Sequence, residues 1–136
     1  MSITDAQRVV IKLGTRLLTR QDGAINFDYL QKLTRVIADL ANKNMEVVLV
    51  SSGAIGAGLG GLRISKKPTT IPEKQATAAV GQGLLIQYYE KYFSDYDLTV
   101  AQILLTREDL MDRRRYINAC NTIHTLLEWK VIPIIN

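Results

Sequence analysis

Apolar residues along this chain change their spacing several times, from short continuous runs to runs in which they recur every three or four positions. The continuous runs are rich in Val and Ile and are bounded by polar residues or glycine, which predicts β-strands. They are apolar on both faces, as in a parallel sheet covered by helices on each side. The predicted strands are residues 8–13, 46–51, 98–105 and 131–135.

Between these runs the apolar residues take helical spacing, and each helical stretch begins at a residue that suits a helix N-terminus. Asn26 precedes the first stretch and Asp112 precedes the last. Thr70 and Glu73 form a Thr-x-x-Glu capping box at the start of the longest one. The predicted helices cover about residues 27–41, 71–93 and 113–127.

Strands and helices therefore alternate in the order βαβαβαβ. This order is typical of an α/β protein, and we expect an open three-layer αβα sandwich on a mostly parallel sheet. No glycine- or serine-rich linker divides the 136 residues, and this length is typical of one domain. Pro133 has no backbone N–H for a central strand to donate, so it predicts either an edge strand or a local break near a site.

The composition favours an ordinary folded protein, with 47% hydrophobic and 22% charged residues. The net charge is +4, and the basic cluster Arg113–Arg115 is flanked by acidic residues, so we expect no nucleic-acid contact. Cys120 is the single cysteine, which excludes an internal disulfide and favours a reducing compartment such as the cytoplasm. His124 lies in an apolar helical pattern, so we expect it to be partly buried rather than catalytic.

Membrane insertion and secretion find no support in the sequence. No apolar run approaches the ~18 residues that a membrane-spanning helix needs. Residues 1–5 also lack the basic stretch and the apolar core of a signal peptide. We therefore expect no membrane partner.

Candidate chemistry lies just after the predicted strands, because ligands of open α/β sheets collect at the carboxyl ends of the strands. Lys12 is a charge inside an apolar run, and an unpaired buried ammonium is costly. A bound phosphate would satisfy it, as would an ion pair or an edge position open to solvent. Gly14 and Thr15 favour the phosphate, because a glycine turn exposes backbone N–H groups and Thr15 adds a hydroxyl.

The segment from Ser51 to Gly61 runs from a strand into a glycine-rich helix. The free N–H groups at the start of such a helix bind a carboxylate or a phosphate, although the same glycines also permit close packing on a neighbouring helix. Gly56, Gly58 and Gly61 match the G-x-G-x-x-G spacing of dinucleotide-binding loops, but the match begins well after the strand end. The sequence contains no Walker A motif.

Five blocks, taken in order, carry a family pattern: VVIKLGT at 9–15, VLVSSGAIGAG at 48–58, KQATAAVGQ at 74–82, QILLTR at 102–107 and VIPIIN at 131–136. Together they resemble the amino acid kinase superfamily over essentially the whole chain. Within it they are most similar to the branch that phosphorylates the side-chain carboxylate of glutamate, because the Ser-Gly-Ala-Ile segment differs from the aspartate and acetylglutamate branches. Another acidic amino acid kinase is the alternative within the family.

The resemblance implies transfer of the γ-phosphoryl group of ATP, with Mg²⁺, to L-glutamate as the first step of proline synthesis. The implied site residues are Lys12 for catalysis; Lys12, Gly14 and Thr15 for the ATP phosphates; and Ser52, Gly53, Ala54 and Asn136 for glutamate. No metal ligand is expected within this chain. The resemblance also implies feedback inhibition by proline and a homo-oligomer in the intact protein.

Kinase domains of this family are considerably longer than this chain. We therefore expect residues 1–136 to form the N-terminal, glutamate-binding portion, with the ATP-binding portion and any C-terminal domain absent and with no activity of its own. Two readings of other classes stay open. One is a dinucleotide-binding module that uses the three spaced glycines, and the other is a regulatory or assembly fragment without catalysis.

Overall fold

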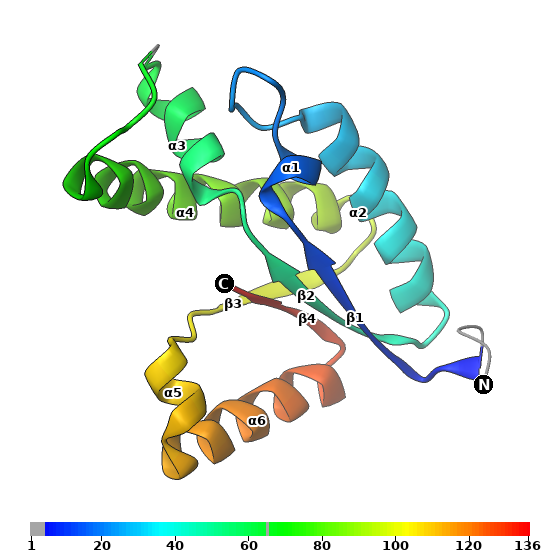
Figure 1. The fold of residues 1–136 in the computed structure, drawn as a ribbon. Helices are drawn as coiled ribbons and strands as arrows, with labels where there is room; N and C mark the ends of the chain where they lie inside the picture. The colour runs from blue at the N-terminus through cyan, green and yellow to red at the C-terminus, as the bar shows by residue number, and fades with distance from the viewer. Residues whose placement is uncertain (1–4, 65) are drawn as a thin grey trace.

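In the computed structural model, which describes residues 5–64 and 66–136, four parallel strands form one sheet (Figure 1). They are β1 (Arg8–Leu13), β2 (Glu46–Ser51), β3 (Thr99–Ile103) and β4 (Val131–Ile135), in the spatial order β1-β2-β4-β3. Each strand lies within the range that the apolar runs predict. Residues 1–4, on which the expectation about secretion mostly rests, lie outside the described ranges.

Helices connect the strands and begin where the caps predict. Asn26 Oδ1 accepts the Tyr29 N–H at 3.1 Å, and Asp112 Oδ1 accepts the Arg115 N–H at 2.9 Å. The sequence pattern does not predict the short helix α1, because four residues are too few to show a helical spacing of apolar positions. The helices are α1 (Thr15–Leu18), α2 (Phe27–Asn42), α3 (Ala54–Leu62), α4 (Ile71–Ser94), α5 (Arg107–Met111) and α6 (Arg113–Glu128). No helix among residues 5–64 and 66–136 combines the length and apolarity needed to cross a bilayer.

The sheet separates two helical layers, as expected for an αβα sandwich (Figure 1). Helices α2 and α4 cover one face, where Ile37, Leu49, Tyr89 and Phe93 belong to one fully buried cluster. Helix α6 packs on β4 from the opposite face, on which Pro133 is buried. The α/β class and the parallel sheet are therefore confirmed.

The sequence predicts that residues 8–13 form a buried strand, and the structure shows that β1 is only partly buried. It lies at the edge of the sheet, and its side chains alternate between covered and open faces. Val9 and Ile11 pack on the core, whereas Val10 is 62% exposed and Lys12 is also exposed. The ammonium of Lys12 therefore reaches solvent and forms no ion pair with the residues that the structure describes, so burial is not a reason to place a phosphate beside it.

Pro133 does not lie on an edge strand, because β4 is placed between β2 and β3. The backbone of Asn136 pairs with β3, since its N–H donates to the Ile103 carbonyl at 3.0 Å. Backbone groups of a parallel strand alternate in direction, so the missing N–H of Pro133 faces β2. Pairing with β2 begins only at Ile134, opposite Leu49. The expectation of an edge strand is therefore wrong, and Pro133 is tolerated because pairing with β2 starts only after it, while pairing with β3 continues from Val131 to Ile135.

Candidate functional site at the strand ends

Three strands bring the predicted site residues to one edge of the sheet. β1 and β2 run in register, with Lys12 opposite Val50 and Leu13 opposite Ser51. On the other side of β2, Val50 lies opposite Ile135, which directly precedes Asn136. The sequence expectation that the strand ends converge is thus met for β1, β2 and β4. The end of β3 lies beyond β4 and carries none of these residues.

Hydrogen bonds tie the ends of β1 and β2 together through Ser52. The Ser52 N–H and the Ser52 hydroxyl both donate to the Leu13 carbonyl, each at 3.0 Å. Thr15 Oγ1 donates to Ser52 Oγ at 3.0 Å. Thr15 and Ser52, predicted to contact different substrates, are therefore in direct contact. Because the Ser52 hydroxyl already donates to the backbone, it must rotate before it can donate to a carboxylate.

Helix α3 begins directly after this link and presents uncapped N–H groups. Gly53 is its N-cap residue, with φ +101°, a left-handed conformation that favours glycine. No side chain among the described residues caps this end, and the first intrahelical bond is from the Ala57 N–H to the Gly53 carbonyl. The N–H of Ala54 and those of the rest of the first turn are available to an anion, where the helix dipole adds positive potential.

Gly14 leaves open space beside Lys12. Its φ is −76°, which any residue adopts, and a Cβ placed on it would meet no atom within 4 Å. Neither packing nor backbone conformation within the described chain explains a glycine here. Open space at a glycine that lies between Lys12 and Thr15 in the sequence would let a phosphate approach the backbone closely.

Asn136 is held by helix α4. Its side-chain amide donates to Gln82 Oε1, and its backbone pairs with β3. Gln82 belongs to one of the five family blocks, but its sequence position suggested no role. The contact fixes the orientation of the Asn136 amide at the edge where Ser51 also lies.

Tyr89 of α4 is a second contact that sequence reasoning missed. It is fully buried, and its hydroxyl lies 2.7 Å from Ser51 Oγ. Ser51 Oγ donates to the Ser52 carbonyl at 3.0 Å, so Tyr89 donates to Ser51. Burial raises the pKa of Tyr89 to about 12, and the hydrogen bond to Ser51 partly opposes that rise. A tyrosine at helical spacing in the sequence indicates only a core position.

Helix packing explains the three spaced glycines on which the dinucleotide-binding alternative depends. Gly56, Gly58 and Gly61 lie inside α3, whereas the fingerprint glycines form the loop before a helix. A Cβ on Gly58 would lie 2.0 Å from the Thr77 carbonyl oxygen of α4. One on Gly56 would lie 2.6 Å from the Gly23 carbonyl oxygen. These glycines let α3 approach its neighbours closely, and this part of the chain forms no dinucleotide loop.

His124 is exposed, so the expectation of partial burial is wrong. Its Nε2 lies 3.5 Å from Arg8 Nη1, on the far side of the sheet from α2. The residues Arg113–Arg115 are exposed at the start of α6, and Arg115 lies 3.5 Å from the Asp109 carboxylate. Neither feature is near the strand ends.

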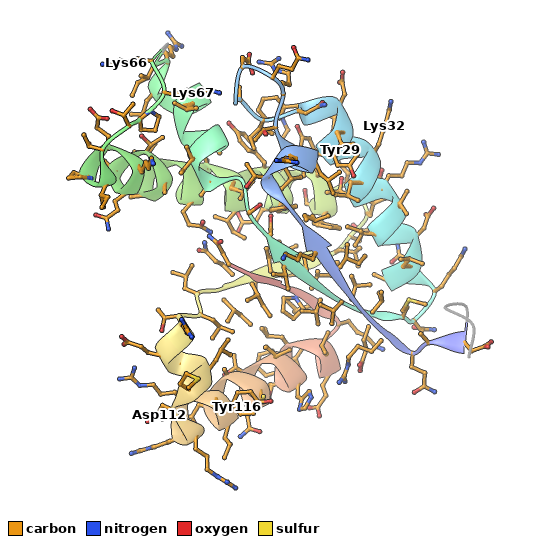
Figure 2. The ribbon with its side chains drawn as sticks, in the orientation of Figure 1. Tyr29, Lys32, Lys66, Lys67, Asp112 and Tyr116 are labelled. Carbon is orange, nitrogen blue, oxygen red and sulfur yellow. The ribbon has the colours of Figure 1, made fainter. Side chains whose placement is uncertain are left out.

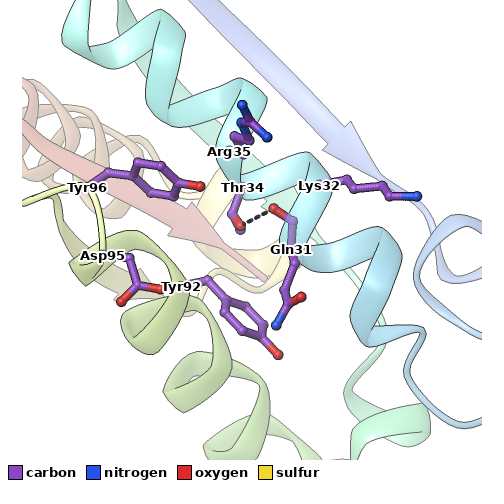
Figure 3. Close-up of a pocket in the computed structure, with 7 residues that line it drawn as sticks. All are labelled: Gln31, Lys32, Thr34, Arg35, Tyr92, Asp95 and Tyr96. Carbon is purple, nitrogen blue, oxygen red and sulfur yellow. Dashed lines mark hydrogen bonds between the residues drawn. The ribbon is translucent and has the colours of Figure 1, made fainter.

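A hollow of about 390 Å³ lies between α2 and α4, lined in part by Lys32, Arg35, Tyr92 and Tyr96 (Figure 3). Thr34, which also lines it, donates to the carbonyl of Gln31 in its own helix at 3.0 Å. None of the strand-end residues lines this hollow. It is therefore not the candidate site.

Metal-binding side chains do not gather in the described part of the chain. No three His, Cys, Asp or Glu residues among residues 5–64 and 66–136 lie close enough together to hold an ion. What the strand ends offer is a cation, hydroxyls, an amide and helix N–H groups. Groups of these types are the ones that bind anions in proteins, and they suit the positioning of carboxylates and phosphates.

Comparison with known proteins identifies the group of sequences to which these features correspond. The sequence profile described as Amino acid kinase family matches residues 7–136. A protein named glutamate 5-kinase from Thermoanaerobacter sp. (strain X514) is 57% identical over 129 residues, which cover 95% of this chain and 35% of that protein.

Two further relatives carry the same name. The protein from Moorella thermoacetica is 53% identical over 136 residues, covering 100% of this chain and 36% of its own length. The one from Clostridium perfringens is 53% identical over 135 residues, covering 99% of this chain and 50% of its own length. The chain thus spans between a third and a half of the length of the curated relatives it matches.

Proposed function

This chain belongs to the amino acid kinase family, and from that premise we propose that it is the N-terminal, glutamate-binding portion of a glutamate 5-kinase. The reaction is transfer of the γ-phosphoryl group of ATP to the side-chain carboxylate of L-glutamate, which yields L-glutamyl 5-phosphate and ADP. The name and the high identity of the relatives support the substrate. The anion-binding character of the strand ends supports the chemistry.

The reaction needs no general base. A glutamate side chain is ionised near neutral pH, because its ordinary pKa is about 4.3. One of its carboxylate oxygens forms the new bond to the γ-phosphorus while the bond from that phosphorus to the bridging oxygen of ADP breaks. Phosphoryl transfer therefore depends mainly on positioning and on neutralising charge. The described site residues include a lysine and hydrogen-bonding groups, which suit those two tasks.

Each strand end has a distinct part in the proposal. Lys12 neutralises charge on the transferring phosphoryl group, and the open space at Gly14 lets that group approach the backbone. The N–H groups at the start of α3, together with Ser52, Gly53 and Ala54, bind glutamate. Asn136, oriented by Gln82, completes the glutamate site from β4.

The described residues do not fit a magnesium site, because no acidic cluster lies at the strand ends. We therefore derive no step through the ion from this chain. The family resemblance places the adenine site outside these residues, so we expect ATP to be held largely by other residues. Cytoplasmic location, inhibition by proline and homo-oligomer formation stay predictions of the family resemblance.

The observation that carries the proposal is the convergence of Lys12, Ser52 and Asn136 with the uncapped start of α3. A coupled ADP assay tests it on a full-length enzyme that carries this chain as its N-terminal part. Glutamate should release ADP, and hydroxylamine should trap the acyl phosphate as a hydroxamate. Turnover of aspartate or N-acetylglutamate without turnover of glutamate would contradict the proposal, as would preferential binding of NAD(P) over ATP.

A further inference from the structure

The hollow of about 390 Å³ between α2 and α4 is separate from the strand ends, and we call it the α2–α4 hollow. Its volume is within the range of about 300–1,000 Å³ that is usual for small-molecule sites. One wall belongs to α2, and the other belongs to the end of α4 and the two residues that follow it. The lining residues are Gln31, Lys32, Thr34, Arg35, Tyr92, Asp95 and Tyr96 (Figure 3).

Tyr92 contributes a hydroxyl that no other described residue satisfies. Only 8% of Tyr92 is exposed, and its hydroxyl forms no hydrogen bond with any residue that the structure describes. No fully buried side-chain polar atom in the described ranges lacks a partner, so this hydroxyl belongs to the small exposed part of Tyr92. Tyr92 lines the α2–α4 hollow, and a buried tyrosine usually finds a partner for its hydroxyl. A ligand in the hollow would be that partner.

Opposite charges line the two walls of the α2–α4 hollow. Arg35 belongs to α2 and Asp95 to the end of α4, and neither forms an ion pair with any residue that the structure describes. Asp95 is the C-cap residue of α4, where the helix dipole adds negative potential. Lys32 also lines the hollow, but its side chain extends from α2 away from α4 (Figures 2 and 3). The hollow therefore has one cationic wall and one anionic wall.

This distribution of charge selects for a ligand that carries both signs. Asp95 would repel a purely anionic ligand, and Arg35 would repel a purely cationic one. A carboxylate can accept two parallel hydrogen bonds from an arginine, and an ammonium can donate to an aspartate. The rings of Tyr92 and Tyr96 offer apolar surface, and the amide of Gln31 points from α2 toward Tyr92 (Figure 3). These features together fit a small zwitterion with an apolar body.

We propose that the α2–α4 hollow is a second binding site, which takes an α-amino acid with an uncharged, apolar side chain. Arg35 binds its carboxylate and Asp95 binds its ammonium, while the Tyr92 hydroxyl makes a further hydrogen bond to it. The second carboxylate of glutamate would find no cation here, because Lys32 extends away from α4. None of the strand-end residues lines the hollow, so the inference does not depend on the proposed function.

Calorimetric titration of a full-length protein that carries this chain tests the ligand class, with L-phenylalanine as the probe. L-Phenylalanine should bind with a Kd of about 1 mM or below. Two analogues each lack one charge: 3-phenylpropionate lacks the ammonium and 2-phenylethylamine lacks the carboxylate. Each should bind about tenfold more weakly, the effect of losing one hydrogen bond to a charged group. Saturating L-glutamate should leave the Kd for L-phenylalanine unchanged, because the two sites share no residue.

Substitutions in the same protein test the residues. Arg35→Met and Asp95→Asn should each raise the Kd for L-phenylalanine about tenfold, and Tyr92→Phe should raise it about threefold, because a neutral hydrogen bond contributes less than a charged one. Arg114→Met is the matched control for Arg35→Met, since Arg114 is exposed on α6, on the opposite face of the sheet. Thermal unfolding without ligand identifies any variant that fails to fold.

Three results would overturn the inference. One is binding of L-phenylalanine that glutamate abolishes, since this would place the ligand at the strand ends. Another is equal affinity for L-phenylalanine and 3-phenylpropionate, which would indicate a site for anions. The third is no binding of L-phenylalanine up to about 10 mM. Failure to phosphorylate glutamate would contradict only the proposed function, because the titration measures binding without turnover.

Discussion

At the scale of single residues, Tyr89 of α4 makes one buried hydrogen bond to Ser51, the last residue of β2. Its hydroxyl donates to Ser51 Oγ at 2.7 Å, and Ser51 Oγ in turn donates to the Ser52 carbonyl. Because Tyr89 and Ser51 are both buried and the Ser52 carbonyl belongs to the proposed glutamate-binding loop, the conformation of that loop depends on a core residue.

Replacement of the Tyr89 hydroxyl should weaken both the fold and the site. Tyr89→Phe removes the hydrogen bond that the buried Ser51 Oγ accepts, while Ser51 still donates to the Ser52 carbonyl, and we expect this loss to lower the free energy of unfolding by about 1–2 kcal/mol. The KM for glutamate should rise modestly, with little change in kcat. Urea unfolding of the chain and steady-state kinetics of the full-length enzyme measure the two effects. Tyr88→Phe is the control, because Tyr88 packs edge-on against Phe27 and makes no hydrogen bond among the described residues.

The raised pKa of Tyr89 should make the free energy of unfolding depend on pH in the alkaline range. Its pKa rises from 10.0 to about 12 in the folded chain, chiefly because burial disfavours the phenolate. Between these values the unfolded chain has lost a proton that the folded chain keeps, so stability is complete below pH 10 and falls as the pH rises toward 12. The stability advantage of the unsubstituted chain over Tyr89→Phe should therefore shrink between pH 8 and pH 11. A constant difference would contradict the assigned burial.

Lys12 and Ser52 should affect different kinetic constants. Lys12→Ala should lower kcat on the order of a hundredfold or more and change the KM for glutamate much less, because charge develops on the phosphoryl group chiefly in the transition state. Ser52→Ala should mainly raise the KM for glutamate, and it should also lower stability by about 1 kcal/mol since Ser52 links β1 to β2. Lys32→Ala is the control, because Lys32 lies on α2 away from the strand ends. Loss of stability with unchanged kinetics in both variants would show that these residues are only structural.

At the scale of elements, the position of α3 depends on its contact with α4. A Cβ on Gly81 would lie 1.5 Å from the Ala54 carbonyl oxygen, and one on Gly58 would lie 2.0 Å from that of Thr77. Both obstacles are backbone atoms, which cannot move aside as a flexible side chain can. The start of α3, which carries the proposed anion-binding N–H groups, is therefore placed by a glycine on another helix.

Two glycine-to-alanine substitutions on α4 distinguish the effect of the contact with α3 from the effect of helix propensity. Gly81→Ala should destabilise the chain by about 3 kcal/mol or more, because the backbone of α3 must shift. Gly83→Ala, where a Cβ would meet nothing within 4 Å, should stabilise it by up to about 1 kcal/mol. Thermal unfolding of both variants measures the contrast. Equal effects would mean that α3 and α4 do not pack as closely as described.

At the scale of the whole molecule, the two faces of the sheet are covered unequally. α2 and α4 cover one face, whereas the face on which α6 packs is open at β1, where Val10 is 62% exposed. The proposed site residues likewise account for glutamate and for one phosphate-contacting lysine, and the family resemblance places the adenine site outside them. We expect that catalysis requires more than these residues.

Residues 1–136 alone should bind glutamate weakly and release no detectable ADP. Positioning of both substrates is most of the catalysis in phosphoryl transfer, so the absence of one substrate's site removes the rate enhancement. A coupled ADP assay on the purified chain, with a full-length enzyme as the reference, measures this. Turnover within about tenfold of the reference would show that the chain builds an ATP site by itself, for example as a homo-oligomer.

The sequence by itself determined the elements and the residue types at their ends. Caps such as Asn26 and Thr70 act within one helical turn, and apolar spacing reports which side of an element faces the core, so both can be read locally. The same local signals predicted the parallel sheet and the places of Lys12, Ser52 and Asn136 at strand ends, whereas the roles proposed for these residues come from the family resemblance.

Only the tertiary structure decided what depends on distant neighbours. The placement of β4 inside the sheet, the exposure of Lys12 and His124, and the contacts of Tyr89 with Ser51 and of Gly81 with α3 all join residues far apart in sequence. The apolar run of β1 is the same whether the strand is central or at an edge. Its burial depends on how many strands and helices surround it, and periodicity along one strand carries no information about that number.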